Sequence, residues 1–306
     1  MGRCEIVKRP LWVVGWLAAM MAVYLLWARP YQLRWGATDA EARGAMPGDE
    51  LDAHPGFLAT RAINIDATAE EIWPWLMQMG YTRAGFYGFD LFEKVGTTRG
   101  PLGVDRILPQ FQDFKVGDEV PVSPFLTMVF GEIQPFEYMV WSAPDLQASY
   151  TWALEPVDDS QTRLVVRTRW NHRWTQPGWL ALDLLTEFTD HVAMRKVLQG
   201  LKSRAEGDIP PRSDANVEFF MHIGTAAISI WAAIALLRLP LTPRRWLLGL
   251  AGGLACIVTW YAPDALWSGS ALSLLVVWAV RVQQRDHRIS RILAERDAES
   301  QFQGRR

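Results

Sequence analysis

FLATRAINIDATAEEIWPWLMQMGYTRAGFYGFDLFEKV, residues Phe57 to Val95, carries the most structural information in this sequence. It opens with apolar residues at alternate positions, a pattern typical of a half-buried strand. Thr68 and Glu71 then predict a capping box at the start of a helix, because each side chain can bond the backbone N–H of the other. One apolar face of that helix follows, formed by Ile72, Trp75, Leu76 and Met79.

The sequence after this stretch predicts an antiparallel sheet and a closing helix. Apolar residues of the last strand candidate alternate with Arg163, Arg167 and Arg169, so we expect one dry and one solvated face. A long helix over residues 179–206 should lie across the dry face, and the prolines Pro210 and Pro211 should end it. The strand candidates are Val116–Pro121, Leu126–Ile133, Phe136–Trp141, Tyr150–Leu154 and Thr162–Trp170.

Several blocks between residues 57 and 206, about half of the chain, occur in an order that indicates a known family. They are the strand and capped helix above, then Arg83–Tyr87, Asp105–Pro109, Gln112–Pro121 and Met194–Glu206. Together they resemble the START-like, or SRPBCC, superfamily, and within it the bacterial polyketide cyclase/dehydrase-like proteins. The resemblance implies an α+β helix-grip fold, in which a curved antiparallel sheet wraps a long C-terminal helix around a deep apolar cavity.

Composition excludes several classes of function. Half of the residues are hydrophobic and the net charge is −2, without a basic aromatic patch, which argues against a nucleic-acid partner. Cys4 and Cys256 form no disulfide framework. Glu187 and His191 share a helix face, but a metal site needs further ligands, so we expect no metal. Fingerprints of hydrolases, kinases and dehydrogenases are absent, and we expect no cofactor.

Apolar runs near both ends of the chain predict an integral membrane protein. We expect an N-terminal region, 1–35, with a transmembrane helix at about 11–28, and a START-like domain at 36–212 with its core at 57–206. The third region, 213–306, should hold three transmembrane helices at about 217–237, 246–262 and 265–280, followed by a basic tail. A cleaved signal peptide is the alternative for the first run.

Arginines in the loops predict the orientation of these spans. Arg238, Arg244 and Arg245 lie between the second and third spans, and the C-terminal tail is also rich in arginine. The positive-inside rule places both in the cytoplasm. The N- and C-termini are then cytoplasmic, and the domain lies on the outer, periplasmic or extracellular, face of a bacterial plasma membrane. Because Arg29 and Arg34 would then lie outside, a cytosolic domain remains the alternative.

Large aromatic residues in the domain favour an apolar ligand. Core packing explains any one of them, but so many in one small domain indicate a pocket. We therefore expect a membrane-anchored binding or carrier module for a lipid-, isoprenoid- or polyketide-like molecule. The candidate ligand-binding residues are Trp75, Met79, Phe86, Tyr87, Trp141 and Trp152.

Charged residues in the family-like blocks leave an enzyme as the alternative. Asp90 and Glu93, with Arg83 or Arg106, could act as acid and base groups of a cyclase or dehydratase. Ion pairing between them is the structural alternative. A third hypothesis is a structural or signalling module whose cavity is filled by its own side chains. Carboxylates in the cavity would favour the enzyme, an apolar cavity the carrier, and a filled cavity the third hypothesis.

Overall fold

The computed structural model describes residues 18, 21–51, 54–93, 103–143, 148–171 and 179–237, with isolated positions between 274 and 296. The chain divides into two compact units. Ala18–Asn216 forms one unit, and Met1–Leu17 with Val217–Arg306 forms the other. The first unit contains the sheet and the candidate site, and the fold is described for that unit.

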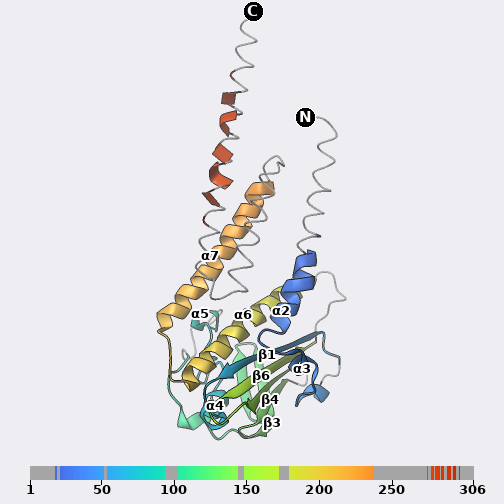
Figure 1. Cartoon of the computed structure of the whole chain (residues 1–306), viewed down its shortest axis with the longest axis vertical. Coiled ribbons are helices and arrows are strands. Elements are labelled where there is room, and N and C mark those ends of the chain that lie inside the picture. Colours follow the sequence, from blue (N-terminus) through green and yellow to red (C-terminus); the bar gives the residue numbers. More distant parts are fainter. Residues whose placement is uncertain are drawn as a thin grey trace, which may run out of the picture. The chain divides into compact units, whose positions relative to one another are not determined.

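An antiparallel sheet forms the centre of the first unit (Figure 1). It has six strands in the order β1-β6-β5-β4-β3-β2. From β2 to β6, each strand pairs with the next one along the chain, and β1 pairs with β6. The expected α+β architecture with an antiparallel sheet is confirmed. The strands are β1 (Phe57–Ile65), β2 (Glu119–Ser123), β3 (Leu126–Gln134), β4 (Tyr138–Ala143), β5 (Ala148–Pro156) and β6 (Thr162–Trp170).

The helices begin and end close to their predicted signals. In the helix after β1, the Thr68 side chain accepts from Glu71 N, and Glu71 Oε2 accepts from Thr68 N at 2.8 Å, which confirms the capping box. The helical segments are η1 (Tyr24–Ala28), α2 (Arg29–Leu33), α3 (Asp39–Arg43), η2 (Asp49–Leu51), α4 (Ala69–Met77), α5 (Asp90–Glu93), η3 (Pro109–Phe111), α6 (Leu180–Ala205) and α7 (Arg212–Leu237).

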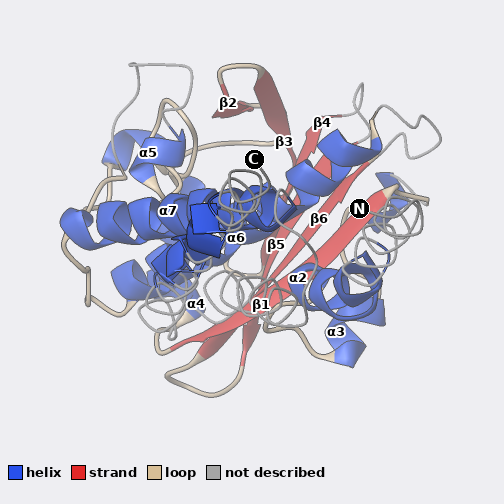
Figure 2. Cartoon of the chain, turned by 90° about the horizontal axis from the view of Figure 1, so that it is seen from above, coloured by secondary structure: helices blue, strands red, loops and turns tan. Residues whose placement is uncertain are grey.

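The long helix α6 lies against one face of the sheet, as Figure 2 shows. The pairing register places alternate side chains of neighbouring strands on that face, for example Trp141 beside Tyr150 and Trp152 beside Val166. These strands and the second half of α6, including Leu198, share one buried hydrophobic core. A sheet wrapped around a long C-terminal helix is consistent with a helix-grip fold.

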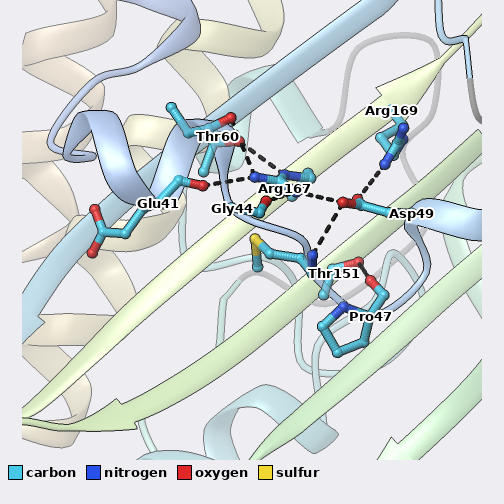
Figure 3. Close-up of polar contacts among 10 residues, drawn as sticks. Glu41, Gly44, Pro47, Asp49, Thr60, Thr151, Arg167 and Arg169 are labelled. Atoms are coloured by element: carbon cyan, nitrogen blue, oxygen red, sulfur yellow. Dashed lines mark hydrogen bonds and ion pairs between the residues drawn. The ribbon is translucent and has the colours of Figure 1, made fainter.

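The opposite face of the sheet differs from the expectation of a solvated surface. Arg167 and Arg169 are buried, with 2% and 6% exposed area, because the segment from α3 to η2 covers them. Arg167 donates from Nη1 to Asp49 Oδ2 at 2.7 Å and from Nη2 to Glu41 O at 2.7 Å, and Arg169 pairs with the same aspartate (Figure 3). Alternation along a strand shows that the two faces of the sheet differ, but it does not show whether another segment of the chain covers the polar face. The prediction of a wet face was wrong for this reason.

The described residues include no helix that is both long enough and apolar enough to cross a bilayer. The expected span at 246–262 lies outside the described residues, as do most of the spans at 11–28 and 265–280. The expected span at 217–237 falls within α7, which over its described residues does not meet the length and apolarity needed to cross a bilayer.

Candidate functional site

A cavity of about 780 Å³ lies between the sheet and α6. This volume is within the range of small-molecule binding sites. The sheet contributes Trp141, Tyr150, Trp152 and Trp170 to its wall, all from the face that meets α6. Helix α6 contributes side chains at helical spacing, namely Leu182, Asp183, Thr186, Thr189, Asp190, Ala193, Met194 and Val197.

One part of this wall is apolar and aromatic. The rings of Trp141 and Trp152 are buried, and their centroids lie 5.2 Å apart. Phe86 meets Trp141 edge-on, at 6.4 Å between centroids. Met194 and Val197 lie on the facing part of α6. Aromatic rings and aliphatic chains are suited to contact the hydrocarbon part of a ligand.

Another part of the wall is polar, where the first half of α6 meets β5 and β1. Asp190 lines the cavity and accepts a hydrogen bond from Arg61 Nη1 at 2.7 Å. The guanidinium of Arg61 is almost wholly buried and also donates from Nε to Gln32 O. Burial raises the pKa of Tyr150, and the charge of Asp190 raises it further, while Arg61 opposes the shift. The Tyr150 hydroxyl therefore keeps its proton at neutral pH and can donate to a ligand.

A second set of polar contacts ties α2 to α6. Arg29 binds Glu187 through two hydrogen bonds, each 2.8 Å long. His191 Nδ1 lies 3.2 Å from Gln32 O, and because a carbonyl oxygen only accepts, Nδ1 carries the proton. Burial, together with the charges of Arg61 and Arg195, lowers the pKa of His191 to about 2. These groups hold the helices together and keep His191 neutral.

The predicted ligand-binding residues fall into two groups. Phe86, Trp141 and Trp152 line the cavity. Trp75, Met79 and Tyr87 pack in the hydrophobic core beside it. The Tyr87 hydroxyl faces α4, where it donates to Trp75 O at 3.0 Å and accepts from Gln78 Nε2 at 2.9 Å.

The structure does not bring the predicted acid and base groups together. The guanidinium of Arg83 stacks over the Phe114 ring at 3.6 Å and donates to Met77 O. Burial lowers the pKa of Arg83 to about 10. Arg83 lies outside the lining of the cavity.

The other three candidates lie in two places, with Asp90 and Glu93 on α5 and Arg106 in the segment before η3. Asp90 Oδ1 accepts from Gly103 N at 2.9 Å. The side chain of Arg106 is exposed. Neither residue lines the cavity. Glu93 is the last residue of α5, and its side chain lies outside the described part of the chain.

The sequence reasoning did not single out Tyr150, Asp183, Asp190 or Arg61 as site residues. A signal for three of them was present. Asp183 and Asp190 belong to the helical stripe of α6 that lines the cavity, and Tyr150 alternates with Trp152 along one strand face. Arg61 had no such signal, because a single arginine in β1 does not show whether its side chain meets the core or solvent. Among the described residues, no group of three or more metal-ligating side chains occurs.

No protein-family model matches the sequence, and no curated protein matches it. Solved structures do match. A polyketide cyclase-like protein from Corynebacterium glutamicum is 14% identical, and the match covers 47% of this chain and 88% of that one at a TM-score of 0.32. The Aha1 dimer protein from Colwellia psychrerythraea is 17% identical, and the match covers 50% of this chain and 98% of that one at a TM-score of 0.29.

A third similar structure is CalC, a self-sacrificing resistance protein from Micromonospora echinospora. It is 11% identical, and the match covers 50% of this chain and 96% of that one at a TM-score of 0.30. TM-scores near 0.3 carry no argument about function, so the candidate site rests on the geometry of the cavity.

Proposed function

We propose that this chain is a binding or carrier module that holds an apolar small molecule between its sheet and α6. The observation that carries the proposal is the cavity of about 780 Å³ with Phe86, Trp141 and Trp152 in its wall. A polycyclic or lipid-like molecule that buries its apolar surface there gains about 25 cal/mol for each Å² removed from water. We propose a lipid-, isoprenoid- or polyketide-like ligand, bound without a cofactor.

The proposal also places the module at a membrane. Its support is the set of apolar runs in the sequence, together with exposed apolar side chains in residues 21–27, where Leu26 is 80% exposed. A carrier for a poorly soluble ligand gains from a position where that ligand is concentrated. We propose an integral membrane protein of the bacterial plasma membrane, with cytoplasmic termini and the START-like domain on the outer face.

A cyclase or dehydratase is the second candidate function. The observation that favours it is the presence of two carboxylates, Asp183 and Asp190, in the cavity wall. The ion pair between Asp190 and Arg61 argues against Asp190 as a general acid, because the positive charge favours the ionised form of the carboxyl. A structural or signalling module with a filled cavity has no support in a cavity of this size.

Native mass spectrometry of the full chain, purified from its own membrane in mild detergent, tests the carrier proposal. We expect a defined apolar molecule to copurify and to be released by lipid extraction. Ala193→Trp should remove it, because Ala193 lines the cavity and an indole would fill part of its volume.

Leu185→Trp is the matched control. It adds an indole to the same helix at an exposed position outside the cavity lining, so the bound molecule should be retained. Retention by Ala193→Trp would place the molecule elsewhere. A chain that copurifies with nothing and also fails to bind a panel of fatty alcohols, isoprenoids and polycyclic compounds would contradict the proposal.

A further inference from the structure

Four polar residues, Arg61, Tyr150, Thr168 and Asp190, form what we call the polar corner of the cavity. Tyr150 and Thr168 are cross-strand partners on β5 and β6, so their side chains leave the same face of the sheet. Arg61 lies on that face of β1, opposite Val166 of β6, and reaches Asp190 of α6 at 2.7 Å. Tyr150 and Asp190 line the cavity, and Arg61 and Thr168 lie behind them.

Two buried polar groups of the polar corner make no hydrogen bond within the described part of the chain. They are Arg61 Nη2 and Thr168 Oγ1. The raised pKa of Tyr150 keeps its hydroxyl in the donating form, and no hydrogen bond contributes to that shift. The carboxylate of Asp190 already accepts from Arg61. Buried polar groups are costly without a partner, so a corner of this kind favours an acceptor from outside.

The apolar part of the wall restricts what can carry that acceptor. Trp141 lies next to Tyr150 in the β4–β5 register, and Trp152 follows Tyr150 on the same face of β5. A ligand whose oxygen meets Tyr150 therefore has its hydrocarbon part against these indoles. The two parts of the wall together select both the orientation and the chemistry of the ligand.

We infer that the polar corner is a subsite for a ligand oxygen, with the Tyr150 hydroxyl as the donor that reaches it. The ligand is then an apolar molecule that carries a carbonyl or a similar acceptor oxygen, rather than a plain hydrocarbon. This inference rests on the proposed function, because it names the ligand class of the same cavity.

A pair of probes with one carbon skeleton tests the inference. Anthracene and 9,10-anthraquinone share their three rings and differ in two carbonyl oxygens. Binding to the full chain is measured by equilibrium dialysis, with the same micelles on both sides. We expect the quinone to bind roughly tenfold more tightly, the size of one net hydrogen bond. Tyr150→Phe should bring the ratio of the quinone affinity to the anthracene affinity to about 1, and it should leave the affinity for anthracene unchanged.

Tyr81→Phe is the control, because Tyr81 also lines the cavity but lies in the turn after α4, away from the polar corner. It should preserve the ratio. Thr168→Val, which removes one buried hydroxyl, provides a second variant and should lower the ratio in part. Equal affinities in the unmodified chain, or a ratio that survives in Tyr150→Phe, would overturn the subsite alone. Failure of both probes to bind the unmodified chain would count against the cavity as a binding site and against both proposals.

Discussion

His191 is a buried histidine with a neutral ring, and this state gives the protein a pH dependence. Burial and the charges of Arg61 and Arg195 lower its pKa to about 2, while the hydrogen bond to the Gln32 carbonyl opposes the shift. Below pH 6.5 the unfolded chain binds a proton at this position and the folded chain does not. The contribution of His191 to the free energy of unfolding should therefore be fully present above pH 6.5. Below that pH, the free energy of unfolding should fall by about 1.4 kcal/mol for each pH unit.

Urea unfolding of the full chain between pH 7.5 and 5 measures this slope. His191→Asn is the control, because the asparagine amide can still donate to Gln32 O but does not titrate. The variant should be less stable at pH 7.5. Below pH 6.5, its free energy of unfolding should depend on pH less steeply than that of the unmodified chain, by about 1.4 kcal/mol per pH unit. A variant with the same slope as the unmodified chain would show that His191 is not the group responsible.

At the scale of elements, the segment from α3 to η2 acts as a cover for the outer face of the sheet. Asp49 of this segment pairs with both Arg167 and Arg169 (Figure 3). Among the described residues, it is the only carboxylate of the segment that does so. Asp49→Asn leaves two buried guanidinium groups without this charge, so we expect the free energy of unfolding to fall by about 3 kcal/mol. Chemical denaturation of the full chain measures the loss.

Asp39→Asn is the matched control for this prediction. Asp39 also pairs with two arginines, Arg34 and Arg43, but its side chain is 70% exposed. Exposed ion pairs contribute little, so the loss should stay below about 0.5 kcal/mol. Equal losses for the two variants would mean that the cover does not depend on its buried ion pairs.

At the scale of the whole molecule, the proposed membrane location gives a topology that can be measured. Because apolar runs lie near both ends of the sequence, the full chain should stay in the membrane pellet after alkaline carbonate extraction. A reporter enzyme that is active only in the cytoplasm should work when fused after Arg306. The same reporter inserted at the exposed turn at Asp159 should be inactive. Release by carbonate would contradict membrane integration, and an active reporter at Asp159 would place the domain in the cytosol.

Elements defined by neighbouring residues could be predicted from the sequence. The capping box of Thr68 and Glu71, the alternation in β6 and the long helix over residues 180–205 all depend on spacings of two to four residues. The strands were displaced by a few residues, as for β2, which begins at Glu119 rather than at Val116. Such ends depend on where a strand finds its partner, which a local pattern does not show.

The sequence alone was sufficient for the α+β class, the order of the elements and the apolar character of the face that meets α6, because local periodicity expresses each of them. Only the tertiary structure decided which residues share a site. Arg61 and Asp190 are separated by 129 positions, and Arg167 and Asp49 by 118. Strand pairing and the course of α6 bring these charges together. The polar corner and the buried arginines are therefore properties of the folded sheet, in which distant positions become neighbours and water is excluded from their charges.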